Sequence, residues 1–427
     1  MATELYREEA STLARRLAQR EITAEAVLRS CLDRIAEREP VVQAWEFLDV
    51  DAALAQARAI DAGPQRGLLH GLPVAVKDLF DTFDMPTTYG STIYAKHRPL
   101  ADAASVALCR EQGAVMVGKT VTTEFATFKP GKTRNPHRAT QTPGGSSSGS
   151  AAAVADFMVP LAFASQTAAS VIRPAAFCGV VGYKPSYGLI NRSGVKALSD
   201  PLDTIGFIAR SVDDVALFAA AANGERNAPD LAQSGTPRIA LCQTHEWPHA
   251  DEDTRAAFAH AEASLGKAGV PLRDLQLPLL FSQLLQAQKE VMAFDLAHSL
   301  ADERLRHPAQ LSDGLSQMLA QGLRVPVERH HANLQLAASA RAMIPSLLGD
   351  TDALLAPSAI GEAPGIEQTG DPVFGRVWTF LGLPCVHLPF FRGRTGMPVG
   401  LQLIGRHGED LALLRAARAL LPMLAHA

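Results

Sequence analysis

Residues 141–182 read QTPGGSSSGSAAAVADFMVPLAFASQTAASVIRPAAFCGVVG, and the rest of the chain is organised around them. The segment opens with a loop that sets three serines between glycines, residues 144–149. An apolar, alanine-rich segment follows and ends in a second turn, residues 166–170. Gly-rich serine loops are common as inert linkers, but a linker is rarely followed at once by so apolar a segment. Two hydroxyl-bearing turns joined by one buried helix-and-strand unit can bring two serines together over a pocket.

This stretch closely resembles the signature of the amidase signature hydrolases, and matching motifs recur along most of the chain. The matches are densest from about residue 67 to residue 214. The resemblance implies one α/β domain over residues 1–427, with a large mixed β-sheet sandwiched between layers of α-helices. It also implies a catalytic core of about residues 66–215 together with residues 350–412. The further matching motifs are GLPVAVKD (71–78), GKTVTTEFA (118–126), RNP (134–136), GVVGYKP (179–185), PCVHLP (384–389) and PVGLQLIGR (398–406).

The composition is that of an ordinary globular protein. The 427 residues are 47% hydrophobic and 20% charged, enough to build a substantial core. The net charge is −4, and the absence of a basic block argues against nucleic acid as a partner. No apolar run reaches the ~18 residues of a membrane span, and the N-terminal MATELYREEA lacks the apolar core of a secretion signal. We therefore expect a soluble, cytoplasmic monomer or homodimer that acts on a small molecule.

Cysteines and histidines give no sign of a metal or redox site. The five cysteines are scattered and odd in number, a pattern typical of buried free thiols in a reducing compartment. None of the thirteen histidines belongs to a ligand constellation, and H-E-x-x-H is absent. His330 and His331 stand in a polar stretch that looks exposed. We expect neither a metal nor a cofactor.

Helical and strand-like patterns alternate along the chain, as in α/β proteins with a parallel or mixed sheet covered on both faces. Val27, Cys31 and Ile35 recur at helical spacing, with Thr23 a candidate N-cap and Pro40 the expected end of that helix. Outside the signature we expect two helices within residues 8–37, helical segments at 52–60, 104–112, 122–127, 213–222, 254–268, 280–305, 311–322 and 410–420, and strands at 72–76, 114–117, within 198–208, and at 237–242, 271–275, 352–357, 384–389 and 400–404.

Lys77 follows five apolar residues at the C-terminal end of the predicted strand 72–76. Ligand chemistry in open α/β sheets sits at strand ends of this kind. Burial would lower the pKa of the ammonium group, and a neutral lysine amine can act as a general base. A lone lysine near a strand end is normally exposed and structural, so the residues alone leave both readings open. The resemblance implies the catalytic role, because Lys77 falls where the family has its catalytic lysine.

Two serines complete the machinery that the resemblance implies. Ser146 matches the family's bridging serine, which follows a cis peptide bond, although Ser147 and Ser148 compete for the role on chemistry alone. Ser170 matches the nucleophile. Lys77 would take a proton through Ser146 from Ser170, which would attack the substrate carbonyl and form an acyl-enzyme. Ser146 would return the proton to the leaving amine, and water would then hydrolyse the ester.

The turn before Ser170 departs from the family pattern. The backbone N–H groups of residues Thr167, Ala168, Ala169 and Ser170 would hold the oxyanion. The family usually has Gly-Gly where this chain has Ala168-Ala169. If either position needed a positive φ, alanine would cost roughly 1–2 kcal/mol and misdirect the donors. A catalytically impaired homologue is therefore an alternative, although Lys77, Ser146 and Ser170 are all present.

Arg173 is the main pointer to substrate. It lies three residues after the nucleophile, as in malonamidase-like members, and could pair bidentately with a substrate carboxylate. It could equally hold the loop through backbone carbonyls. Gln166 replaces an acid often found in this turn, which removes a competing partner for Arg173. Thr127 and Phe128 are expected to line the pocket. Helices within residues 280–323 are expected to roof it, and their Phe281, Met292 and Phe294 either favour apolar substrate groups or form an ordinary core stripe.

These observations predict a serine hydrolase that cleaves C–N bonds in small linear amides, with esters and carbamates (urethanes) as further substrates of the same acyl chemistry. One alternative is an amidotransferase A-type subunit, which uses the same triad to release ammonia for transamidation on tRNA and needs partner subunits. The other is a catalytically impaired homologue that serves as a binding or scaffold protein.

Overall fold

In the part of the chain that the structure describes, one mixed β-sheet of 11 strands runs through the molecule. The computed structural model describes residues 4–232 and 235–425. The strand order is β1-β3-β2-β4-β6-β5-β10-β11-β9-β7-β8. β2 is parallel to β3 and β4, and β7 is parallel to β8 and β9. The other neighbours are antiparallel. The strands are β1 (Trp45–Leu48), β2 (Pro73–Lys77), β3 (Val115–Thr120), β4 (Leu161–Gln166), β5 (Val181–Lys184), β6 (Thr204–Ala209), β7 (Ile239–Leu241), β8 (Leu272–Asp274), β9 (Ala353–Pro357), β10 (Cys385–Arg392) and β11 (Pro398–Ile404).

The sheet is sandwiched between layers of α-helices, as the sequence predicts. α7, α14 and α8 pack side by side against the sheet, whereas α5 and α6 pack against each other and against β4, β5 and β10. The helices are α1 (Ala10–Ala18), α2 (Ala24–Val42), α3 (Val50–Asp61), α4 (Ala104–Glu111), α5 (Ser148–Ala155), α6 (Ile172–Cys178), α7 (Val212–Ala222), α8 (Glu252–Lys267), α9 (Leu284–Ser299), α10 (Ala301–Arg306), α11 (Asp313–Gly322), α12 (Val327–Leu348), α13 (Val373–Phe380) and α14 (Asp410–Ala425).

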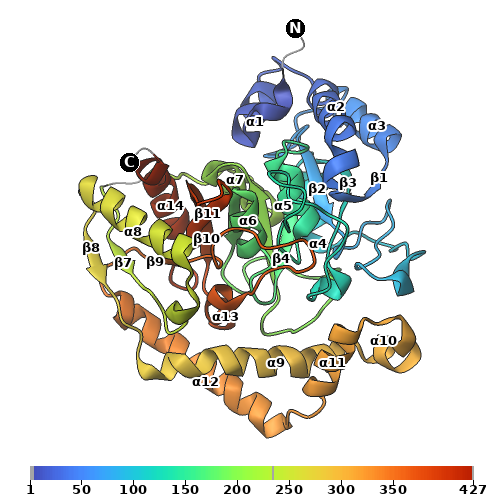
Figure 1. Ribbon diagram of the computed structural model, residues 1–427. Helices are drawn as coiled ribbons and strands as arrows, with labels where there is room; N and C mark the ends of the chain where they lie inside the picture. The colour runs from blue at the N-terminus through green and yellow to red at the C-terminus, as the bar shows by residue number, and fades with distance from the viewer. Residues whose placement is uncertain (1–3, 233–234, 426–427) are drawn as a thin grey trace.

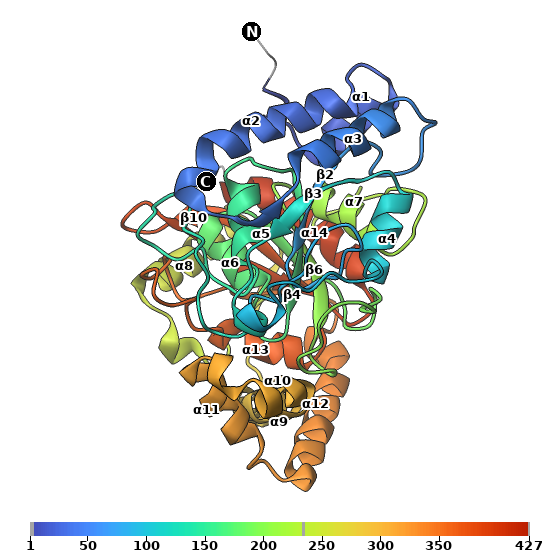
Figure 2. The ribbon, with the colours of Figure 1, turned by 90° about the vertical axis from the view of Figure 1, so that its right-hand side faces the viewer.

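Two groups of helices lie at opposite ends of the molecule. α1, α2 and α3 cover one end, and α9, α10, α11 and α12 form a layer at the other (Figure 1). The short helix α13 lies between this second layer and the sheet, as the turned view in Figure 2 also shows. α13 packs directly against α9. We call α9–α12 the helical layer.

The signature segment is almost completely buried. Every residue of β4 and of α6 is buried. In the neighbouring helix α5 a glycine allows backbones to approach closely, since a Cβ atom on Gly149 would lie 2.2 Å from the Ala44 carbonyl oxygen. In such a close-packed interior, even one added methyl group displaces its neighbours. The turns at either end of this segment are therefore held on a rigid base.

Most predicted elements are confirmed, and three local expectations are wrong. Pro40 does not end its helix, because α2 continues to Val42 and Thr23 caps its start. Residues 122–127 contain only a short 3-10 turn, since Phe125 (φ 43°) and Ala126 (φ 52°) have left-handed backbone conformations that stop a helix.

The third error concerns His330, which is only 9% exposed and lies on α12. No clear apolar pattern in the sequence predicts this helix. Its buried stripe contains a histidine, an asparagine and alanines, so the apolar periodicity is weak. His330 Nε2 lies 2.9 Å from Asp295 Oδ1 on α9, which pairs the two long helices of the helical layer.

Candidate active site

Lys77 ends strand β2 and has no solvent exposure. Its Nζ atom donates hydrogen bonds to Ser146 Oγ at 2.8 Å and to Ser165 Oγ at 2.9 Å. Within residues 4–232 and 235–425, no carboxylate pairs with it. Burial lowers the pKa of Lys77 to about 7, against the opposing charge of Asp203. An amine with this pKa is a competent base at neutral pH, because a large fraction of it is unprotonated.

Only one of the three loop serines reaches Lys77. The Gly145–Ser146 peptide bond is cis, and Ser146 is fully buried beside the lysine. Ser147 Oγ bonds instead with the backbone of Ser165, and Ser148 Oγ donates to the Val121 carbonyl. Of the three hydroxyl groups, only that of Ser146 is therefore placed to exchange a proton with Lys77.

Ser170 lies on the turn between β4 and α6. It keeps 6% of its surface exposed, and its Oγ atom makes no hydrogen bond with any residue that the structure describes. Arg173 ties this turn to the serine loop, because its Nη2 atom donates to the Gly145 carbonyl at 2.6 Å. The structure thus bonds Lys77 to Ser146 and holds Ser170 on a neighbouring turn with a free hydroxyl group.

The carbonyl groups of the Ser170 turn are engaged by side chains around it. Thr379 Oγ1 donates to the Ala168 carbonyl at 2.6 Å, and Gln288 Nε2 donates to the Thr167 carbonyl at 3.1 Å. The Thr167 hydroxyl donates to Asp203 Oδ1 at 2.6 Å. In contrast, the N–H groups of residues 167–170 have no acceptor within the described ranges. Unpaired N–H groups in a rigid buried turn are the donors that an oxyanion hole requires.

The Ala168-Ala169 doublet does not strain this turn. Neither alanine has a positive φ, so the backbone adopts a conformation that alanine tolerates. The methyl group of Ala169 faces Gly375 on α13, where an added Cβ atom would lie only 2.6 Å away from it. Gly375 therefore makes the room that the extra methyl group needs.

Arg173 and Gln166 support the turn and the loop. The Arg173 guanidinium donates to the carbonyls of Gly145 and Gly370, which is the loop-holding alternative described above. Gln166 Oε1 accepts from the N–H groups of Val171 and Ile172, and Gln166 Nε2 donates to Thr379 Oγ1 at 2.8 Å. Each side chain is thus engaged with protein groups around the turn and the loop.

Thr127 and Phe128 face the helical layer. Together with Ser312, Leu315 and Met318 of the α11 region they line a cavity of about 530 Å³. Glu124, just before them, accepts a hydrogen bond from the Ser312 N–H group at 3.1 Å and another from its hydroxyl. Of the predicted roof, α11 lines this cavity, whereas Phe281 and Met292 are buried in a core with Trp378 and Ile172.

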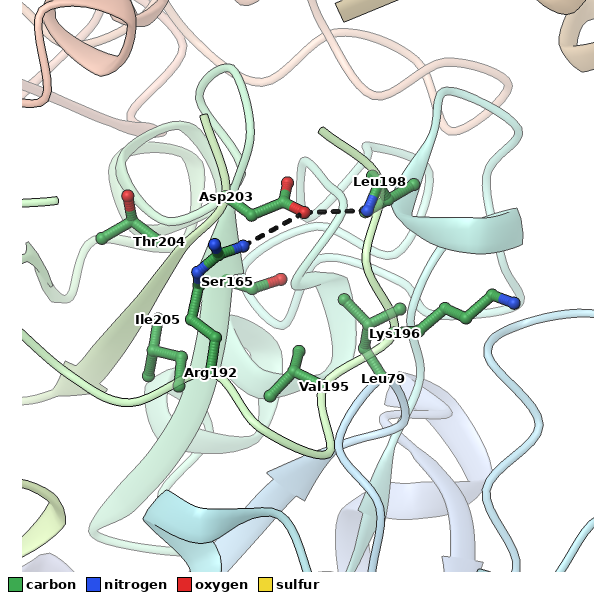
Figure 3. A pocket seen from close by; sticks show the side chains of 9 residues that line it. All are labelled: Leu79, Ser165, Arg192, Val195, Lys196, Leu198, Asp203, Thr204 and Ile205. Atoms are coloured by element: carbon green, nitrogen blue, oxygen red, sulfur yellow. Dashed lines mark hydrogen bonds and ion pairs between the residues drawn. The ribbon is translucent and has the colours of Figure 1, made fainter. Parts of the chain in front are cut away.

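A second, much smaller cavity of about 10 Å³ is lined by Ser165, whose hydroxyl group accepts a hydrogen bond from Lys77. Figure 3 shows Ser165 and Asp203 on its wall, with Arg192 beside Asp203. The Asp203 carboxylate accepts from the Leu198 and Ser199 N–H groups as well as from Thr167, and burial raises its pKa. The volume of this small cavity, about 10 Å³, is near the minimum that can hold one water molecule. Asp203 therefore links the loop at residues 198–199 to the oxyanion turn and places a negative charge near Lys77.

Comparison with known proteins identifies the family. The model of the amidase family matches residues 26–414. The chain belongs to the amidase signature family. The A-type subunit of the glutamyl-tRNA(Gln) amidotransferase of Acidothermus cellulolyticus is 39% identical over 337 residues, which cover 73% of this chain and 66% of that protein. The corresponding protein of Symbiobacterium thermophilum is 33% identical, with 93% of each chain covered. The solved peptide amidase of Stenotrophomonas maltophilia is 28% identical with a TM-score of 0.82, covering 97% of this chain and 96% of that one.

Several residues around this amidase signature site are not predicted by any sequence motif. Ser165, Asp203, Gln288 and Thr379 all bond to Lys77 or to the oxyanion turn. Arg376 was also missed, although it is the lone charge in the apolar run VFGRVWTF that forms α13. That isolated charge was the available signal, because a charged side chain in a buried helix needs a specific partner.

Two further features of the described part of this amidase signature chain concern membrane-spanning helices and groups of metal ligands. Within the described ranges, no helix is long and apolar enough to cross a membrane. No group of three or more potential metal ligands occurs in that part of the chain either.

Proposed function

We propose that this chain hydrolyses amide C–N bonds through an acyl-enzyme formed on Ser170. The observation that carries the proposal is the fully buried pair of Lys77 and Ser146, joined at 2.8 Å, beside a turn whose N–H groups are unpaired. A buried lysine with its pKa lowered to about 7 supplies the base, and the turn supplies the oxyanion donors. Among the described residues, the Ser170 hydroxyl group has no hydrogen-bond partner that would compete with its attack on the substrate.

The proton path follows from the hydrogen bonds of Lys77. In the neutral amine, the lone pair accepts the Ser146 hydroxyl proton, and one N–H bond donates to Ser165 Oγ. Ser146 then removes the proton of Ser170 as Ser170 Oγ attacks the carbonyl carbon. As the C–N bond breaks, Ser146 passes its proton to the departing amine and regains one from Lys77. Water, activated by the same pair, cleaves the Ser170 ester and regenerates the enzyme.

The oxyanion donors are the backbone N–H groups of residues 167–170. Loss of one such donor typically lowers kcat by about 10²–10³-fold. Alanine at positions 168 and 169 leaves the donors in place, because neither residue has a positive φ. The positive-φ argument for a catalytically impaired homologue therefore does not apply to this turn.

The same acyl-enzyme chemistry could serve either an amidotransferase subunit or a free-standing hydrolase, and the curated relatives favour the amidotransferase setting. Those reported above are A-type subunits of a tRNA-dependent amidotransferase, which supports a role in releasing ammonia from an amide for a partner to use. This is better supported than the free-standing hydrolase of small linear amides. The peptide amidase with the same fold supports the latter setting. Hydrolysis of esters or carbamates (urethanes) would follow from the same acyl-enzyme in either case.

Covalent labelling tests the shared chemistry. A fluorophosphonate probe should add one adduct to the intact protein, and peptide mapping should place it on Ser170. Ser170→Ala should abolish the adduct, whereas Ser147→Ala, at a hydroxyl group that bonds only to the Ser165 backbone, should keep it. A well-folded protein that forms no adduct would refute the proposal.

A second measurement separates the two settings. Ammonia release from glutamine and from simple amides would be measured for the isolated chain and for material purified together with native partners. Activity on simple amides by the isolated chain supports the free-standing hydrolase. Activity that needs co-purifying subunits and charged tRNA supports the amidotransferase setting.

A further inference from the structure

Arg376 is a buried cation beside the nucleophile turn, and it has no counter-ion among the described residues. Its side chain lies on α13, and the residue is only 7% exposed. No carboxylate in the described part of the chain lies within ion-pair distance of it. Asp371, whose charge favours the ionised form of Arg376, is engaged with the Val373 N–H group instead. Leaving a buried charge uncompensated is costly, and such groups are normally paired.

The hydrogen bonds of Arg376 are distributed unevenly. Its Nη1 atom donates to Gln288 Oε1 and contacts Met292 Sδ at 3.8 Å. Nε is buried and has no partner among the described residues, and Nη2 makes no hydrogen bond there either. The N–H bonds of Nε and Nη2 point in the same direction, so together they form the side-on edge of a guanidinium. This edge matches the two oxygens of a carboxylate.

Arg173, the other buried arginine of this region, provides the contrast. Its Nε and Nη2 atoms both donate to the Gly145 carbonyl, and Nη1 donates to the Gly370 carbonyl. Its donors are thus used by the backbone. The side-on edge of Arg376 is the one that stays free.

The position of Arg376 ties it to the reaction centre. Gln288, its Nη1 partner, also donates to the Thr167 carbonyl in the oxyanion turn at 3.1 Å. Gly375, the preceding residue, contacts the Ala169 methyl group. On another side the guanidinium lies 5.8 Å from the centre of the Phe128 ring, and Phe128 lines the 530 Å³ cavity. Arg376 therefore stands between the turn that carries Ser170 and that cavity.

We propose that the free edge of Arg376 binds a carboxylate of the substrate, so that the amide cleaved at Ser170 belongs to an acidic molecule. This inference rests on the proposed function and narrows its substrate class. Gln288 positions the guanidinium, and Phe128 covers its face. An anionic group there offsets the buried positive charge, whereas a neutral substrate would leave that charge uncompensated.

Matched substrates test the proposal. Succinamate carries a carboxylate on the acyl side and butanamide lacks it. N-Butanoylglycine carries one on the amine side, and N-propylbutanamide lacks it. Arg376→Gln should lower kcat/KM for the preferred acidic amide by about 10- to 100-fold, the usual value of a charge-assisted hydrogen-bonded pair. The loss of kcat/KM on the neutral partner should be clearly smaller than the loss on the acidic amide, and the acidic pair that responds identifies which side carries the carboxylate. Equal losses on acidic and neutral amides would overturn the proposal.

The control variant is Arg324→Gln, which removes one positive charge from an exposed position of the helical layer. This variant should leave kcat/KM unchanged for both the acidic and the neutral amides. Fluorophosphonate labelling of Ser170 in Arg376→Gln shows whether the variant keeps a working nucleophile.

A binding measurement keeps the inference separate from catalysis. Calorimetry would follow the binding of succinate, and separately of N-butanoylglycine, to Ser170→Ala and to Ser170→Ala/Arg376→Gln. Saturable binding of either acid that the second substitution abolishes supports the carboxylate site even if wild-type Ser170 forms no adduct. If neither acid binds Ser170→Ala, the carboxylate proposal fails, while labelled Ser170 in the wild type would leave the hydrolase proposal standing.

Discussion

The signature segment and the helical layer meet at the candidate active site, but they are built differently. β4, the Ser170 turn and α6 are buried throughout; β4 is paired in the sheet, and buried side chains such as Gln166 and Thr379 hold the turn. The helical layer reaches the core through a few side chains, such as Gln288 at Thr167, Ser312 at Glu124 and Asp295 at Ser199. The first region fixes reacting atoms with little freedom, whereas the second shapes a cavity that can vary. Chemistry should therefore be sensitive to the signature segment and substrate binding to the helical layer.

The largest effect should come from the base itself. Lys77→Met keeps the volume and removes the amine, so kcat/KM should fall by about 10²–10⁴-fold, the usual contribution of a general base. In the wild type, kcat/KM should rise with pH around an apparent pKa of about 7 as Lys77 loses its proton. Steady-state rates between pH 5.5 and 9 measure both effects.

Stability should respond to the same substitution with a definite sign. The pKa of Lys77 is lowered from 10.5 to about 7 on folding, so the unfolded chain binds more protons between these values. The lysine's contribution to the free energy of unfolding should therefore rise with pH through this window and be lost as pH falls to about 7. Denaturant titrations of Lys77→Met should show a smaller rise in the free energy of unfolding between about pH 7 and 10.5 than those of the wild type.

If Lys77→Met kept the wild-type kcat/KM, Lys77 could not be the catalytic base.

The next effect tests how the alanine doublet is accommodated. Gly375→Ala would place a methyl group 2.6 Å from that of Ala169, so one of the two backbones must move. A displacement of the oxyanion turn by about 1 Å can cost 10²-fold in rate, and we expect a loss of that order in kcat. The measurement is kcat for Gly375→Ala, Ala169→Gly and the double variant.

The double variant decides the interpretation. Ala169→Gly/Gly375→Ala removes the clash between the methyl groups, so it should recover a large part of the lost activity. The recovery should be incomplete, because the new Cβ atom would still lie 3.0 Å from the Ala168 carbonyl oxygen. No recovery would mean that Gly375 acts on the turn by some route other than Ala169.

A smaller effect, on pH dependence, should follow from Asp203. Its negative charge raises the pKa of Lys77, so Asp203→Asn should lower that pKa further and move the acid limb of kcat/KM to lower pH. The plateau rate should fall about tenfold or less, because the bond from Thr167 becomes a weaker neutral one. Asp200→Asn, at an exposed carboxylate of the same loop, is the control. An acid limb that stays in place would exclude electrostatic coupling between Asp203 and Lys77.

The same contrast explains what the sequence could predict. Lys77, Ser146 and Ser170 lie in a continuous pattern that resembles a known family, and the strand and turns that carry them follow from apolar runs and turn residues. Asp203, Gln288 and Arg376 come from distant segments, and their roles depend on tertiary contacts that spacing cannot reveal. Arg173 illustrates the limit, because its position left a substrate-binding role and a loop-holding role equally open, and only tertiary structure brings its three nitrogen atoms to backbone carbonyls. Helix α12 was missed because its buried face includes polar residues.

The smallest effect should come from the helical layer and should appear in KM. Ser312 caps the start of α11 and bonds with Glu124, just before Thr127 and Phe128. Ser312→Ala removes the hydroxyl group from both contacts, which should lower the free energy of unfolding by about 1 kcal/mol, a typical value for a lost N-cap. Because Ser312 lines the cavity and touches no reacting group, KM should rise about two- to fivefold while kcat stays near the wild-type value. Ser316→Ala, at an exposed serine of the same helix, should change neither. If kcat fell as much as it does in Gly375→Ala, the helical layer would have to be counted as part of the rigid catalytic base, and the division between the two regions would fail.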